Sequence, residues 1–215
     1  AIACLSASGL STQAMAQQSD DANVSRLEEI VVTGARGRPR TVSDSPVPID
    51  VFTAEDLRAV SYTDTNDILK TLVPSFNLGR QPISDGASFI RPATLRGLPT
   101  DKTLILINSK RRHRAALVAI GGSGTQGPDI ATIPSIALKN IEVLRDGASA
   151  QYGSDAIAGV INFILKDASE GISFSVQNGE FSEGDGGQTT IQGNVGLPLG
   201  ENGFLNLSAS VASPG

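Results

Sequence analysis

Hydrophobic residues follow two different spacings along this chain, and the spacing changes near residue 170. Before that point, short apolar runs alternate with segments of helical spacing, for example over 49–72. After it, hydrophobic and polar residues alternate one by one, as at 172–177 and 205–211. A period of two is typical of strands whose two faces lie in different surroundings. The pattern predicts an α+β domain followed by antiparallel strands.

Start and stop signals locate the elements of the first part. A strand is expected at 49–52, followed by a helix that Thr53 caps and that carries acidic residues in its first turn. A second helix is expected over 64–72 and ends before the next proline. Further strands are expected at 94–97 and 104–107. Short helices and strands in alternation indicate one small domain with its own core.

The stretch 141–165 reads IEVLRDGASAQYGSDAIAGVINFIL and carries two strand signals separated by three glycines. The branched and aromatic residues at its two ends suit a half-buried sheet. Gly147, Gly153 and Gly159 are expected where the backbone needs a positive φ or packs closely against another segment. The residues alone predict a strand, tight turns and a second strand, an arrangement that fits any α+β domain.

The order of residue types in this stretch resembles the end of the plug domain of TonB-dependent outer-membrane receptors. The resemblance also extends to Leu95-Arg96-Gly97, while Asn108-Ser109 replaces the Asp-Gly turn usual in the family and predicts a differently shaped loop. It implies that 46–166 is a plug, a small mixed sheet with short helices. It also implies structural or gating roles for a set of plug residues, namely Arg96, Gly97, Glu142, Arg145, Tyr152, Gly153 and Gly159.

The interpretation of the alternating segments of 171–215 depends on their position directly after a plug domain. Taken alone, they fit any antiparallel sheet with one solvated face. After a plug, they predict the first strands of a transmembrane β-barrel with apolar residues outside and polar residues inside. A barrel of the plugged class needs roughly two hundred residues in strands. We therefore interpret the chain as the N-terminal part of a longer receptor, with the plug inside the barrel lumen in a Gram-negative outer membrane.

The first residues predict export. Residues 1–16 are a stretch of small and apolar residues ending in Ala-Met-Ala, which is typical of a signal peptide with cleavage after Ala16. Cys4 is the only cysteine and is removed with that segment, unless it is itself a lipoprotein acylation site. In either case the mature chain holds no disulfide framework.

A short β-prone run interrupts the polar tail and tether expected over 17–45. It has no neighbouring strand in sequence, so its backbone is available for pairing with another protein, although it also fits a first strand of the domain. The run resembles the TonB box of the family, at about 28–34. The resemblance implies that it binds the TonB protein of the TonB-ExbB-ExbD complex through Glu29, Ile30, Val31, Val32, Thr33 and Gly34.

Charged residues inside the predicted strands need an explanation. Burying an unpaired charge costs several kcal/mol. Arg96, Glu142 and Arg145 are therefore expected to form ion pairs within the plug or with the barrel wall, or else to lie on a wet face.

The run 110–114 is the one concentrated basic segment in a chain of net charge -5. That acidic balance argues against a nucleic-acid partner. We favour a solvated loop, with the alternative that Arg111, Arg112 and His113 face an anionic small-molecule ligand. His113 is the only histidine, and no metal site or cofactor is expected.

The sequence at 122–127 fits the G-x-G-x-x-G pattern of dinucleotide sites. Pro128 and Pro134 follow, so no long helix is expected to present its N-terminus to a pyrophosphate. A nucleotide-binding enzyme remains only if a helix follows the loop. We expect a transporter rather than an enzyme.

The resemblance implies TonB-dependent uptake of a scarce ligand, such as a ferric siderophore, cobalamin or a saccharide, across the outer membrane. The alternative is a plug-like periplasmic binding or signalling module without a barrel.

Overall fold

The computed structural model describes residues 31–32, 40–41, 48–77, 89–118, 124–145, 148–180, 187–201 and 203–214. Two larger sheets organise these residues. The first is a mixed sheet in the order β3 (Ile49–Thr53), β8 (Leu138–Leu144), β9 (Gly159–Leu165), β6 (Thr103–Ile107) and β7 (Lys110–Arg111). The second is antiparallel, in the order β10 (Ile172–Gly179), β11 (Gln188–Leu199) and β12 (Gly203–Pro214).

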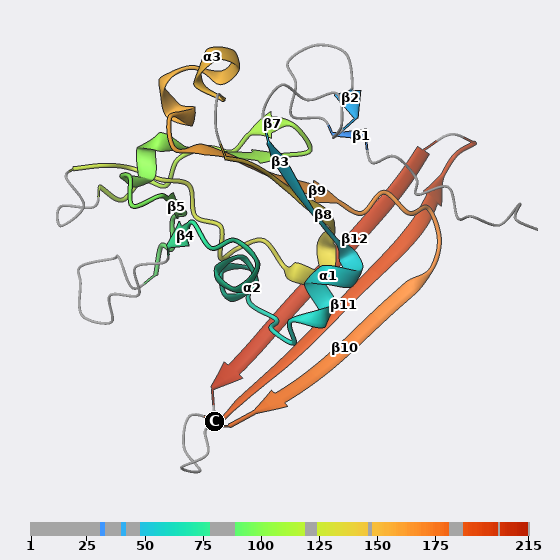
Figure 1. Ribbon diagram of the computed structural model, residues 1–215. Coiled ribbons are helices and arrows are strands. Elements are labelled where there is room, and N and C mark those ends of the chain that lie inside the picture. The colour runs from blue at the N-terminus through green and yellow to red at the C-terminus, as the bar shows by residue number, and fades with distance from the viewer. Residues whose placement is uncertain are drawn as a thin grey trace, which may run out of the picture.

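We call the described residues between 48 and 166 the mixed domain and β10–β12 the outer sheet. Figure 1 shows the three long strands of the outer sheet along one side of the mixed domain. The helices α1 (Ala54–Ala59) and α2 (Thr65–Leu72) lie on the side of the mixed sheet that faces these strands. The predicted order of an α+β domain followed by antiparallel strands is confirmed.

Two hydrophobic clusters hold the mixed sheet. The larger one joins α1 and α2 to one face of the sheet through residues such as Leu69, Ile141 and Phe163, each with no exposed surface. The smaller one lies on the other face, where Leu104 and Val160 pack against Ala156. The nearly continuous apolar sequences of β6 and β9 reflect this burial on both faces.

Both predicted helix starts are confirmed. The Thr53 hydroxyl accepts a hydrogen bond from the Asp56 N–H, and the Asp56 carboxylate accepts one from the Thr53 N–H in return. Asp64 caps α2 by accepting a hydrogen bond of 2.8 Å from the Asn66 N–H. Helix α2 ends at Leu72, so the signals local to each helix were sufficient to place it.

The expected strand at 94–97 is only half right. The strand β5 (Thr94–Leu95) pairs with β4 (Phe76–Asn77), but Arg96 and Gly97 have φ values of 56° and 70° and form a turn. A left-handed backbone cannot continue a strand, so β5 ends at Leu95.

The segment between β8 and β9 also differs from the expected tight turns. It contains a short helix, α3 (Ser149–Tyr152), and a 3₁₀ turn at Ser154–Ala156. Gly153 and Gly159 have φ values of 88° and 136°, which confirms that the backbone needs glycine there. Gly147 lies outside the described residues.

Asn108 and Ser109 form the two-residue turn of the β6–β7 hairpin. Their φ values of 47° and 64° are both left-handed, as in the type I′ turns that Asp-Gly and Asn-Gly sequences favour. The Asn108 carboxamide accepts a hydrogen bond from the Leu165 N–H, which holds this conformation from outside the hairpin. The turn is therefore of the kind that Asp-Gly sequences favour, and a difference in loop shape from the family remains a prediction.

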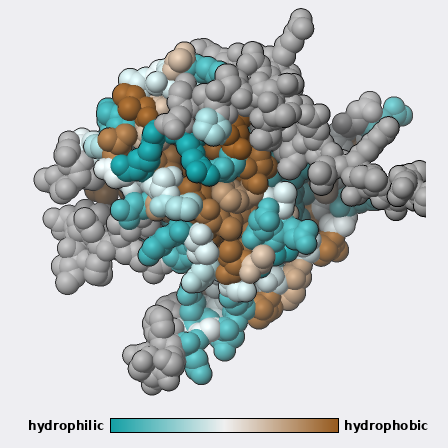
Figure 2. Space-filling view, viewed as in Figure 1, coloured by the Kyte–Doolittle hydropathy of each residue, from teal (hydrophilic) through white to brown (hydrophobic). Residues whose placement is uncertain are grey.

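The outer sheet is apolar on its exposed face and polar on its buried face, whereas the mixed sheet buries its apolar residues. Ile172, Phe174 and Val176 on β10 are 57–83% exposed on the outer face, where brown surface follows β10 in Figure 2. The inner face is polar, and Thr190, Gln192 and Asn194 of β11 are at most 7% exposed there. The register pairs Phe174 with Gly193 and Ile191 with Val211, so the outer face stays apolar across all three strands.

None of the described helices is long and apolar enough to span a membrane.

Near the N-terminus, β1 (Val31–Val32) pairs with β2 (Arg40–Thr41) in antiparallel register. The β-prone run therefore pairs within its own chain, as the alternative of a first strand allowed, but in a separate two-stranded sheet and with a segment expected to be a tether. The predicted signal segment, Glu29, Ile30, Thr33 and Gly34 lie outside the described residues.

Candidate functional site

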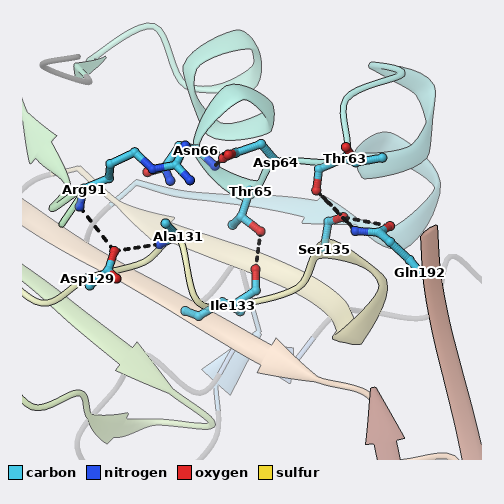
Figure 3. A network of polar contacts seen from close by, with 10 residues as sticks. All are labelled: Thr63, Asp64, Thr65, Asn66, Arg91, Asp129, Ala131, Ile133, Ser135 and Gln192. Atoms are coloured by element: carbon cyan, nitrogen blue, oxygen red, sulfur yellow. Dashed lines mark hydrogen bonds and ion pairs between the residues drawn. The ribbon is translucent and has the colours of Figure 1, made fainter. Parts of the chain in front are cut away.

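The polar inner face of the outer sheet meets the mixed domain around Gln192 (Figure 3). The Gln192 amide donates to the Ser135 hydroxyl at 3.2 Å and to the Thr63 carbonyl at 3.5 Å. It also donates to the Ser210 hydroxyl on β12 at 3.2 Å. Ser135 in turn donates to the Thr63 carbonyl at 2.7 Å. Gln192 thus links β11 and β12 to the start of α2 and to the 3₁₀ turn Ser135–Ala137.

A second layer of contacts fixes the groups that Gln192 binds. The Thr65 hydroxyl donates to the Ile133 carbonyl at 2.6 Å, which ties α2 to the segment before Ser135. Asp64 forms an ion pair with Arg91 at 2.6 Å, and the Arg91 N–H donates to Asp129. This layer orients the start of α2 towards the outer sheet (Figure 3).

One further contact crosses the same junction, because the Gln177 amide of β10 donates to the Ser61 carbonyl at 2.6 Å. The Asn206 amide of β12 donates at 3.2 Å to the Ala168 carbonyl, which belongs to the segment between the mixed domain and β10. Each such hydrogen bond contributes about 0.5–1.5 kcal/mol net, because water satisfies the same groups when the bond opens. A junction of this kind holds the two parts together and still permits them to separate in water.

Asn66 destabilises the start of α2 beside this junction. It is fully buried at the start of α2, and its carboxamide has no hydrogen-bond partner in the described part of the chain. An unsatisfied buried amide costs about 1–3 kcal/mol. The start of α2 is therefore less stable than its packing alone would make it.

Glu142 lies in the middle of the mixed sheet and is 1% exposed. Asn162 on the neighbouring β9 donates to its carboxylate at 3.0 Å and accepts a hydrogen bond from the Ser109 N–H. The alternative of a wet face is wrong for Glu142. Its ion pairing with an arginine remains a prediction.

We expect Asn162→Asp to destabilise the mixed domain by about 3 kcal/mol at neutral pH. The change keeps the size of the side chain but replaces the donor to Glu142 with a second carboxylate, which raises the pKa of one of the pair. A raised pKa in the folded state gives stability at low pH that is lost as the pH rises. The deficit should therefore shrink towards about pH 4. Urea unfolding at several pH values measures it, and a pH-independent deficit would contradict this account.

The predicted arginines bind other groups within the mixed domain. Arg96 donates to the Ala158 carbonyl at 2.9 Å and to the Ile157 carbonyl at 3.2 Å. Arg145 forms an ion pair with Asp50 on the adjacent strand β3. Arg96 therefore holds the segment that precedes β9, and Arg145 holds an edge of the sheet.

Tyr152 and the predicted glycines shape the segment between β8 and β9. Tyr152 packs partly buried against the smaller hydrophobic cluster. A Cβ at Gly159 would lie 2.5 Å from the Leu144 carbonyl oxygen, whereas one at Gly97 or Gly153 would meet nothing within 4 Å. Of these glycines, Gly159 is the one that close packing requires as well as backbone conformation.

The basic run is mostly exposed, as expected for a solvated segment, but its first two residues form a strand and its arginines have partners. Lys110 and Arg111 belong to β7, and Arg111 and Arg114 both form ion pairs with Asp155. Arg112 donates to the Thr132 hydroxyl at 3.1 Å, and His113 is exposed. A role in ligand binding for Arg111, Arg112 and His113 remains a prediction.

We expect Asp155→Asn to lower the free energy of unfolding by up to about 1 kcal/mol at pH 7, because the two pairs are largely exposed. Burial alone raises the pKa of Asp155, but the hydrogen bond from Arg111 and the charges of Arg114 and Arg111 hold that pKa below its ordinary value of 3.8. A lowered pKa gives stability that is lost as the pH falls. The difference from the native protein should disappear below pH 3.8 in a pH series of unfolding curves.

The glycine-rich loop lacks the context of a nucleotide site. From Gly124 to Pro134 the described backbone is irregular, and it leads into a three-residue 3₁₀ turn and then into β8. No helix N-terminus follows the pattern among these described residues, so the nucleotide-binding interpretation is wrong.

The residues of the junction were not found by sequence reasoning. Asp64 was recognised as a helix start, and Gln177 as a polar position of an alternating strand, but neither pattern shows which backbone group they meet. Gln192 lies in a segment whose polar face, Thr190, Gln192 and Asn194, was the available signal.

The outer sheet is apolar on its outer face, and the mixed domain is hydrogen-bonded to its polar inner face. This arrangement is typical of proteins in which a plug domain fills a transmembrane barrel. The family described as TonB-dependent Receptor Plug Domain matches residues 41–160. The chain belongs to this family, and the mixed domain is its plug. Such receptors are outer-membrane proteins with the plug inside the barrel.

Similar proteins support this placement. The chain is 32% identical over 158 residues to the iron-regulated outer membrane virulence protein of Vibrio cholerae, covering 72% of this chain and 22% of that protein. It is 33% identical over 165 residues to the ferrienterobactin receptor of Escherichia coli, covering 75% and 21%. It is 28% identical over 177 residues to the vitamin B12 transporter BtuB of Photobacterium profundum, covering 82% and 26%.

Solved structures agree with this fold. The siderophore receptor PirA of Acinetobacter baumannii matches with a TM-score of 0.61 and 29% identity, covering 80% of this chain and 25% of that one. A variant of the ferric enterobactin receptor of Pseudomonas aeruginosa in complex with enterobactin matches with a TM-score of 0.62 and 28% identity, with the same coverage. The chain spans only about a fifth to a quarter of these relatives.

Proposed function

We propose that the protein takes up a scarce ligand across the Gram-negative outer membrane, with energy supplied by the TonB-ExbB-ExbD complex. The observation that carries the proposal is the joining of a plug-family domain, through the Gln192 junction, to a sheet with an apolar outer face. The relatives include a ferrienterobactin receptor and a vitamin B12 transporter, so ferric siderophores and cobalamin are the first ligand classes to test. Saccharides are the third class that the sequence resemblance implies.

The same proposal assigns roles to individual segments. The run from Glu29 to Gly34 is the TonB box, and it binds the TonB protein by adding a strand through its backbone. Arg96, Glu142 and Arg145 stabilise the plug conformation that must change during transport. The glycines near them do the same. The apolar outer face of β10–β12 contacts lipid, which a periplasmic module without a barrel has no reason to expose.

An uptake assay tests this function. Cells that express the full-length protein are supplied with iron-55 as ferric enterobactin or with cobalt-57 cobalamin, with and without a protonophore. We expect energy-dependent accumulation of one ligand and unchanged surface binding when the proton gradient is removed. Accumulation that persists without the gradient would exclude TonB-dependent transport, and a protein recovered in the periplasm would favour the module without a barrel.

A further inference from the structure

A cavity of about 590 Å³ lies between the plug and the outer sheet. On the plug side it is bounded by the end of α1 and the segment that follows. On the other side it is bounded by the polar inner face of β10. The polar residues that line it are mainly hydroxyls and amides, including Ser61, Tyr62, Ser173, Ser175, Gln177 and Gln192. Its volume falls in the range of sites that hold small molecules, about 300–1,000 Å³.

The charges around this cavity are of one sign. Arg58 and Lys166 line it, and no acidic residue does so among the described residues. Neither cation forms an ion pair within the described part of the chain. Partial burial, and then the charge of Arg58, lower the pKa of Lys166, so the two groups repel each other across the same space. Two close cations without a counterion destabilise the folded protein through their mutual repulsion and partial burial. A bound anion removes this free-energy cost.

Two acidic residues that lie near these cations in sequence are held by other groups. Asp167 follows Lys166 in sequence but pairs with Lys139 at 3.0 Å. Asp56 lies on the same helix as Arg58 but closes the capping box with Thr53. Neither of these two acids lines the cavity, so neither neutralises it from within.

We propose that this cavity binds the anionic groups of a solute as the solute passes along the wall beside the plug, with Arg58 and Lys166 as the binding charges. The chemical class is a small molecule that carries carboxylate, catecholate or phosphate oxygens. The hydroxyls of Ser61 and Ser175 and the Gln177 amide supply hydrogen bonds in place of water. The inference deepens the transport function proposed above and names an acidic ligand for it.

The proposal predicts a local excess of anions over cations at the inner face of β10. A cleft with charge of one sign concentrates counterions by about 10-fold or more at low salt. The test uses the purified full-length protein in detergent with a Ser175→Cys reporter. Its rate of modification is measured with a sulfonate methanethiosulfonate and with a trimethylammonium methanethiosulfonate, which differ in charge. We expect the anionic reagent to be favoured relative to a free thiol.

Three variants test whether the charges of Arg58 and Lys166 cause the preference for anions. Arg58→Gln with Lys166→Gln should lower the anion-to-cation rate ratio by at least about threefold, and high salt should do the same. Lys70→Gln with Lys110→Gln removes the same net charge from exposed positions outside the cavity and should leave the ratio unchanged. Lys166→Arg keeps the charge and should keep the ratio, even if the double glutamine variant fails to fold.

Two results would overturn the proposal. An equal ratio in the native and double-neutralised proteins would mean that Arg58 and Lys166 do not select anions. A reporter that stays unreactive in the folded protein would mean that solutes do not enter the cavity. Both readouts are independent of uptake, so a failure of the transport function itself appears separately in the assay with labelled iron or cobalamin.

Discussion

Replacing Gly159 by alanine is expected to destabilise the plug by about 3 kcal/mol or more. The position combines a φ of 136° with a Cβ that would lie 2.5 Å from the Leu144 carbonyl oxygen. The backbone of β8 cannot move away freely, because Leu144 pairs with Val160 in the register that joins β8 to β9. The first pairs of β9 must therefore open, including the parallel pair of Gly159 with Thr103.

Hydrogen exchange of the β9 amides in the full-length protein measures this loss as a lower free energy of opening. Gly97→Ala is the matched control, since its φ of 70° is also left-handed but a Cβ there meets nothing within 4 Å. That change should cost about 1–2 kcal/mol. Equal losses at the two positions would show that backbone conformation alone, without the contact to Leu144, determines the effect.

Replacing Val32 by proline is expected to reduce ligand uptake at least about tenfold, because a lost strand hydrogen bond and the locked φ together remove more than about 1.4 kcal/mol from pairing with TonB. Val32 lies in β1 and in the predicted TonB box. Strand addition requires the backbone N–H groups of the box, and proline has none. The ligand site on the outer side is unaffected, so surface binding should stay at the native level.

Val32→Thr is the control for this change, because threonine keeps the N–H and the β-branched shape. It should transport at close to the native rate. In the same cells, cross-linking of the box to TonB should fall with proline and persist with threonine. Native uptake by the proline variant would mean that the box does not bind as a strand.

Local signals predicted the elements that local interactions form. Thr53 and Asp64 cap helices through partners two or three residues away, so sequence was sufficient to place both starts. The alternation after residue 171 predicted the apolar outer face for the same reason, since a strand must alternate.

Tertiary contacts decided what sequence could not. Arg96 remains left-handed beside carbonyl groups at 157 and 158, and Asn108 is held by the Leu165 N–H. Neither partner is near in sequence, so a strand was the natural expectation at Arg96 and the form of the turn at Asn108 was not predicted. Gln192 was missed for the same reason, because its plug partners Thr63 and Ser135 lie in a different part of the chain.

The position of β3 determines how the plug responds to mechanical force. β3 is the edge strand of the mixed sheet, and the chain enters it directly from the N-terminal segment. Tension applied at Val31–Val32 therefore reaches the mixed sheet first at Ile49, where the five-residue ladder to β8 and the Arg145–Asp50 ion pair resist it. The next element to carry the load is α1, which lines the cationic cavity. We therefore expect pulling to separate β3 and α1 from the plug before the parallel β6–β9 pair opens.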